Sequence, residues 1–115
     1  MNTFLCTLED IPDHGAVEFD VVGRKVVALR EKEAVFVYLN ICPHLGTPLN
    51  WEPDKFLDQE GAYICCSNHG ALFIKETGEC ISGPCRGMPL SSVPVTLKGN
   101  EVMVDIEPLK PYQPF

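Results

Sequence analysis

The chain has 115 residues, of which 45% are hydrophobic and 22% charged, values typical of one folded domain. Sixteen acidic and nine basic residues give a net charge of −7, which disfavours nucleic-acid binding and favours a basic protein partner. No apolar run approaches the ~18 residues of a membrane span, and no basic patch precedes an apolar segment at the N-terminus. We therefore expect a cytoplasmic protein, in which clustered cysteines bind metal rather than form disulfides.

The first 40 residues predict a series of short β-strands. Residues 3–8 form a strand candidate that a turn-rich segment closes. Residues 16–22 and 25–30 flank Gly23-Arg24 and predict a tight hairpin. Residues 34–40 are rich in β-branched and aromatic side chains, which favour a further strand.

Shorter strands are predicted in the rest of the chain. Residues 62–66 and 71–75 are strand candidates, and residues 53–59 could form one helical turn. Residues 93–97 and 101–106 flank Lys98-Gly99-Asn100 and predict a second hairpin. The whole pattern predicts an all-β fold.

The composition changes at about residue 41. Residues 41–87 contain five of the six cysteines and two of the three histidines. We expect a single domain, with a base from about 1–40 and 88–107, an irregular lobe at 41–87 and an extended, proline-containing tail at 108–115.

Two short motifs within this lobe carry metal-binding residues. C-P-H-L-G begins at Cys42 and includes His44, and C-S-N-H-G begins at Cys66 and includes His69. Two thiolates and two imidazoles suit either zinc or an iron–sulfur centre. Zinc fingers usually pair like ligands within one motif, whereas here each motif offers one cysteine and one histidine. Two such motifs can give both cysteines to one iron and both histidines to another.

In these motifs the chain resembles the Rieske [2Fe–2S] ferredoxins. The resemblance implies that Cys42 and Cys66 bind the buried iron, while His44 and His69 bind the outer iron. It implies a Rieske-like fold, in which an antiparallel β-sandwich base carries a small inserted cluster-binding lobe. It also implies a proline-containing loop over the cluster at Ser82-Gly83-Pro84.

The resemblance further implies a low reduction potential. Thr47 and Asn68 stand where respiratory members of the family have a second cysteine pair, so that disulfide cannot form. Ala71 and Phe73 stand where those members have hydroxyl groups that hydrogen-bond to sulfur. Because such bonds stabilise the reduced cluster, their loss predicts a potential of about −150 mV, the low end of the Rieske range.

Adjacent cysteines leave one ligand to be chosen. Neighbouring residues of a strand point to opposite faces, so only one of Cys65 and Cys66 can face a cluster. Cys66 gives the C-x-x-H spacing, and we expect Cys65 to pack on the other side with Tyr63.

The remaining cysteines and histidine have simpler interpretations. Cys80 and Cys85 could form a redox-active disulfide, but two packed free thiols are favoured in the cytoplasm. We expect Cys6 to be an inert thiol in the core and His14 to be a solvated turn residue.

The segment between the motifs has two open alternatives. Trp51, Phe56 and Leu57 either hold the loop down as a small core or form a docking patch. The acidic residues there are either a solvated face or an electrostatic guide for a basic partner. They are Glu52, Asp54, Asp58 and Glu60, with Lys55 as the single base among them.

The resemblance implies an electron carrier rather than an enzyme. We expect a monomer that carries single electrons from an NAD(P)H-dependent flavin reductase to a terminal oxygenase or similar acceptor. No second histidine and carboxylate set for a mononuclear iron is evident, nor a G-x-G-x-x-G motif for NAD(P)H. The alternatives are a small Rieske subunit or regulatory module of a larger oxidoreductase, such as assimilatory nitrite reductase, and a structural zinc module.

Overall fold

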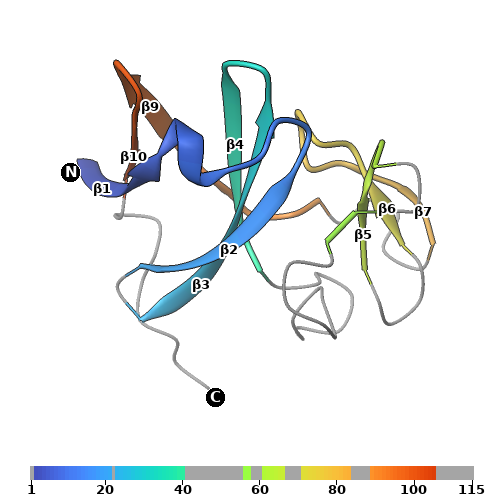
Figure 1. Ribbon diagram of the computed structural model, residues 1–115. Helices are drawn as coiled ribbons and strands as arrows, with labels where there is room; N and C mark the ends of the chain where they lie inside the picture. The colour runs from blue at the N-terminus through green and yellow to red at the C-terminus, as the bar shows by residue number, and fades with distance from the viewer. Residues whose placement is uncertain are drawn as a thin grey trace.

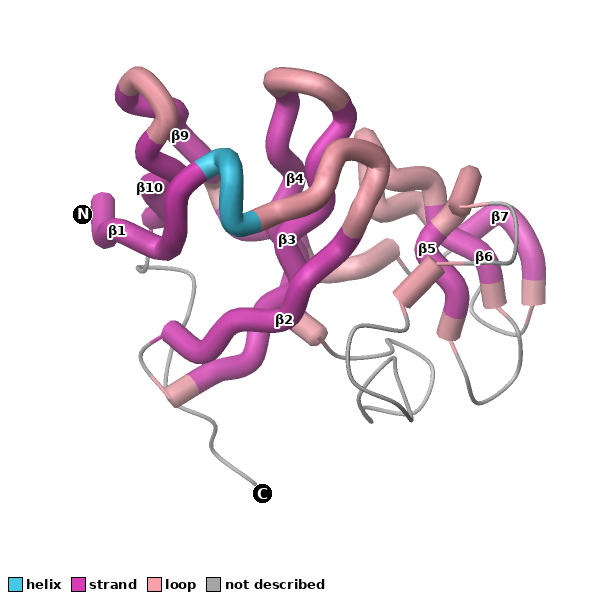
Figure 2. Tube along the Cα trace, viewed as in Figure 1, coloured by secondary structure: helices cyan, strands magenta, loops and turns pink. Residues whose placement is uncertain are grey.

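The computed structural model describes residues 2–21, 23–40, 56–57, 61–66, 71–83 and 89–105. Within these ranges the chain forms three antiparallel β-sheets and one short 3-10 helix, Leu8–Asp10 (Figures 1 and 2). The predicted all-β fold is confirmed. None of the described helical residues forms a segment long and apolar enough to cross a membrane.

A four-stranded sheet lies at the centre of the fold, in the order β2-β3-β4-β8. Its strands are β2 (Ala16–Val21), β3 (Arg24–Glu31), β4 (Ala34–Leu39) and β8 (Ser92–Val93). The predicted hairpin between β2 and β3 is present, and Gly23 has a φ of 75° in its turn, a conformation open to glycine.

The second sheet has the order β1-β10-β9, so it joins the first strand of the chain to the last two. Its strands are β1 (Asn2–Thr7), β10 (Glu101–Asp105) and β9 (Val95–Lys98). The second predicted hairpin is present as β9 and β10, but the strand predicted at 93–97 is divided, because the chain changes sheets at Pro94. Proline has no N–H to donate to a ladder, so β8 pairs with β4 before it and β9 pairs with β10 after it.

The third sheet has the order β5-β6-β7 and lies beyond the opposite side of the central sheet (Figure 1). Its strands are β5 (Ile64–Cys65), β6 (Leu72–Phe73) and β7 (Cys80–Ser82). The sequence did not predict β7. Leu57 forms a β-bridge with Ile64, so it is extended rather than helical. The other residues of the helical turn predicted at 53–59, apart from Phe56, lie outside the described ranges.

Two hydrophobic clusters lie on opposite faces of the central sheet. Alternate residues of β3 divide between them, with Val27 and Leu29 in one and Val26 and Ala28 in the other. The first cluster joins the central sheet to the third sheet, and the second joins it to the β1-β10-β9 sheet. The third sheet therefore shares its core with the base.

Candidate metal centre

Cys66 is the predicted ligand that the structure describes, whereas Cys42, His44 and His69 lie outside the described residues. Cys66 follows β5 and is completely buried. Its N–H donates a hydrogen bond of 2.9 Å to the carbonyl of Ala71, just before β6. This bond joins the two ends of the chain segment 67–70, which carries the second half of the C-x-x-H motif.

The neighbouring cysteine lies in a different environment. Ile64 and Cys66 are both 0% exposed, while Tyr63, which precedes Ile64, is 37% exposed and Cys65, which lies between Ile64 and Cys66, is half-buried. The N–H of Cys65 donates a hydrogen bond to the carbonyl of Phe56. The alternation agrees with the expectation that the two cysteines face opposite sides, and the assignment of Cys66 as the ligand stays a prediction.

The surroundings of Cys66 are apolar and closely packed. Ala71 and Phe73 are buried in the same hydrophobic cluster and offer no hydroxyl donor. Gly83 has a φ of 98°, and a Cβ built on it would lie 2.8 Å from the Cα of Ala71. Gly83 therefore lies in direct contact with Ala71, while Pro84 of the expected proline-containing loop lies outside the described residues. A buried thiol in such surroundings, within a set of two cysteines and two histidines, fits an iron–sulfur cluster.

Two of the three candidate docking residues belong to the core. Phe56 is 0% exposed, and Leu57 packs against the same cluster. The interpretation of these two residues as a small core is confirmed. Trp51 and the acidic residues 52, 54, 58 and 60, with Lys55, lie outside the described residues.

The other described thiols are buried. Cys6 is 2% exposed in the second cluster, and burial, together with the charge of Asp10, raises its pKa to about 11. This confirms that Cys6 lies in the core, and its inertness stays a prediction. Cys80 is a buried free thiol, with its Sγ 3.3 Å from the carbonyl oxygen of Ser82, and Cys85 lies outside the described residues.

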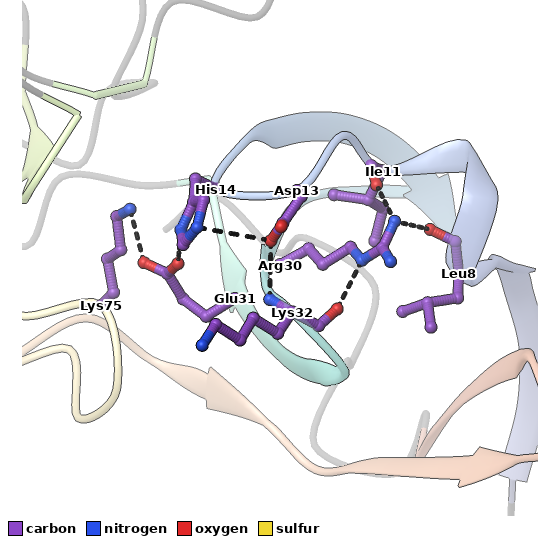
Figure 3. A network of polar contacts seen from close by, with 8 residues as sticks. All are labelled: Leu8, Ile11, Asp13, His14, Arg30, Glu31, Lys32 and Lys75. Carbon is purple, nitrogen blue, oxygen red and sulfur yellow. Dashed lines mark hydrogen bonds and ion pairs between the residues drawn. The ribbon is translucent and has the colours of Figure 1, made fainter.

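A polar network at the edge of the central sheet was not predicted (Figure 3). His14 lies in a turn with 61% of its side chain exposed, as expected, and its ring contacts the carboxylates of Asp13 and Glu31. One nitrogen and two carboxylate oxygens of these three residues lie within 4.8 Å of one another. Glu31 is already paired with Lys75, so we interpret the group as an ion-pair network rather than a metal site.

The sequence did contain a pattern that could have indicated the burial of Lys75. Ala71, Phe73 and Lys75 alternate along one stretch of chain, and all three are buried. The strand predicted at 71–75 is shorter in the structure, since β6 is Leu72–Phe73 and Lys75 lies in the turn that follows. The predicted alternation still places the lysine on the buried face, where it needs an acidic partner.

Comparisons with known proteins agree with the motifs. The profile of the Rieske [2Fe–2S] domain matches residues 2–102. The iron–sulfur subunit of the cytochrome b6-f complex of Chlorobaculum thiosulfatiphilum is 30% identical over 95 residues, which are 83% of this chain but only 48% of that protein. The ferredoxin component of the alkene monooxygenase system of Xanthobacter autotrophicus is 29% identical over 105 residues, or 91% of this chain and 81% of that protein.

A solved structure shows the same architecture. A chain in the complex of reduced oxygenase and oxidised ferredoxin of carbazole 1,9a-dioxygenase aligns with a TM-score of 0.73 and 27% identity. The alignment covers 90% of this chain and 91% of that one. The motifs, the fold and the match over residues 2–102 together show that the chain belongs to the Rieske [2Fe–2S] domain family.

Proposed function

We propose that this protein is a one-electron carrier that passes electrons from a flavin-dependent reductase to a terminal oxygenase. The observation that carries the proposal is the pair of Cys/His motifs on a Rieske domain. Support comes from the similarity to a monooxygenase ferredoxin component and to a chain from a ferredoxin–oxygenase complex. We further propose that the carrier is a cytoplasmic monomer, with the base, lobe and tail divided as the sequence indicates.

We propose Cys42, His44, Cys66 and His69 as the ligands. When bound, the [2Fe–2S] cluster takes up and releases one electron. The chain provides an apolar environment that excludes water near Cys66, since Ala71 and Phe73 are buried and apolar. With no hydroxyl from these two residues to stabilise the reduced state, we infer a potential of about −150 mV, at the low end of the family's range.

The test is an absorption and EPR spectrum of the purified protein, oxidised and after reduction with dithionite. A red-brown protein whose reduced EPR signal has the low average g of mixed Cys/His ligation is expected. A colourless protein that contains zinc, no acid-labile sulfide and no cluster after anaerobic reconstitution would instead establish the structural zinc module.

Matched variants test the ligand set. His44→Cys and His69→Cys should change the spectrum and lower the potential, whereas His14→Cys should keep the spectrum of mixed Cys/His ligation because His14 lies outside both motifs. Cys66→Ser should lose the native cluster signal, and Cys65→Ser should keep it. Native spectra in both histidine variants would contradict the assignment.

A second candidate is a fixed subunit of a larger oxidoreductase. It is favoured by the 30% identity to a cytochrome b6-f subunit, of which this chain spans about half. Thr47 and Asn68 disfavour that particular role, because they replace the expected second cysteine pair. Purification from the native organism distinguishes the two functions, since a stoichiometric large subunit that stays bound would favour the fixed subunit.

A further inference from the structure

Lys75 is the single buried charged side chain among the residues that the structure describes. Its side chain is 3% exposed, and its Nζ lies 2.8 Å from Oε1 of Glu31 at the end of β3. The other carboxylate oxygen of Glu31 contacts the ring of His14, so both oxygens are held (Figure 3). By contrast, the pair of Lys25 and Glu18 spans 3.6 Å and its lysine is 58% exposed.

The backbone around Lys75 is joined to the base by further contacts. The hydroxyl of Tyr38, on β4, donates a 2.6 Å hydrogen bond to the carbonyl oxygen of Lys75. Gly78 packs so closely on this ring that an added Cβ would lie 2.8 Å from Cε1 of Tyr38. The N–H of Leu90 donates to the carbonyl of Gly78. The turn between β6 and β7 is therefore fixed to the base by an ion pair, hydrogen bonds and packing.

β6, Leu72–Phe73, connects this turn to the predicted ligand loop. Lys75 lies four residues after Ala71, at the start of the turn that follows β6. Ala71 accepts the hydrogen bond of Cys66 and borders the segment 67–70 that contains His69. The turn and the ligand loop thus occupy opposite ends of the short β5–β6 pair, and an anchored turn restricts how the ligand end can tilt relative to the base.

We propose that Lys75 and Glu31 are positioning residues for the metal centre, because their ion pair fixes the turn after β6, the strand that directly follows the second ligand motif. The proposal rests on the ligand set proposed above. Neither side chain touches the cluster ligands that the structure describes, so both act through β6. A cluster held in one orientation gives one environment for electron transfer, whereas a loosened lobe gives a distribution of environments.

The test compares Glu31→Gln with Glu18→Gln, which removes the same charge from the pair with the exposed Lys25 and keeps an amide oxygen to accept the hydrogen bond of Asn40. Glu31→Gln leaves the buried ammonium of Lys75 without a charged partner, which is a costly arrangement. We expect amide hydrogens in residues 71–80 to exchange at least about tenfold faster in this variant. We also expect the reduced EPR lines to broaden. Glu18→Gln should match the wild type in both measurements.

A milder variant keeps the test usable if Glu31→Gln does not fold. Lys75→Met removes the buried charge and leaves Glu31, whose side chain is 26% exposed, in contact with water. It should broaden the EPR lines with a smaller rise in exchange, and Lys25→Met should do neither.

The outcomes separate three cases. Faster exchange with unchanged EPR lines would overturn the positioning role and leave a purely structural pair. Unchanged exchange in both Glu31→Gln and Lys75→Met would show that the ion pair does not fix the turn between β6 and β7. A wild-type protein without a Rieske signal would contradict the proposed function instead, and the exchange rates would still decide whether the ion pair fixes the turn.

Discussion

Replacement of Phe73 by tyrosine tests the low-potential interpretation most directly. Phe73 is completely buried on β6, where it pairs with Ile64 on one side and Cys80 on the other. A new hydroxyl there cannot reach water, so it must find a protein or cluster partner or remain unsatisfied. The resemblance to the Rieske family places that hydroxyl beside a cysteine sulfur.

The two possibilities differ in their effects on the reduction potential and on the stability of the fold. A hydrogen bond to sulfur that is stronger in the reduced state by about 0.5–1.5 kcal/mol raises a one-electron potential by about 20–60 mV. Such a bond also satisfies the hydroxyl, so the stability of the fold changes little. A hydroxyl without a partner instead costs about 1–3 kcal/mol of stability and leaves the potential unchanged.

The assay is a potentiometric titration of Phe73→Tyr followed by absorption, with hydrogen exchange as the measure of stability. Phe56→Tyr is the matched control, since Phe56 is equally buried in the same hydrophobic cluster but does not stand at a position where the resemblance implies a hydroxyl group. We expect a raised potential in Phe73→Tyr alone. If both variants lose stability and neither changes the potential, the reasoning about the missing hydroxyls is refuted.

Three further predictions follow from single contacts. Gly78→Ala should lower the free energy of unfolding by about 1–3 kcal/mol for the overlap with the ring of Tyr38, in addition to the cost of the positive φ. Gly99→Ala should show the cost of the positive φ alone, because no atom lies within 4 Å of its built Cβ. Denaturation of both variants measures the difference. The hydrogen bond from Lys75, with a smaller contribution from the His ring, lowers the pKa of Glu31 below 4.5, so its stabilising effect is present above that value and is lost as the pH falls through the lowered pKa. Hydrogen exchange between neutral and acidic pH should show this loss in the wild type, and Glu31→Gln should lack it. The buried Cys6, with its pKa raised to about 11, should resist alkylation in the native protein and react in urea, and equal labelling in both conditions would contradict its assignment to the core.

The longer strands could be predicted because they obey local rules. Residues 34–40 are β-branched and aromatic, and the observed β4, Ala34–Leu39, ends one residue earlier. The β2–β3 hairpin follows from Gly23, which takes the positive φ of its turn. These strands carry their own alternation, so a single sequence contains the information that is needed.

The missed features depend on contacts between distant segments. β7 has only three residues, Cys80–Ser82, too few to show an alternating pattern, and it is defined by its pairing with β6. The alternation at 71–75 places Lys75 on a buried face, but it does not name the acidic partner, because Glu31 lies 44 positions away in the sequence. Pro94 did carry a local signal, and its missing N–H explains why one predicted strand became two.

The arrangement of the core ties the candidate metal centre to the stability of the whole fold. β3 packs one face against the lobe through Val27 and Leu29 and the other against the β1-β10-β9 sheet through Val26 and Ala28. Cys66 belongs to the first of these clusters, so the wall around the proposed ligand is built partly from base residues. The described residues of the lobe have no core apart from this cluster, so a large shift of these residues would open the packing on β3. For the electron carrier proposed above this coupling is useful, since the packing that stabilises the fold also limits how far the environment of Cys66 can change when the charge changes.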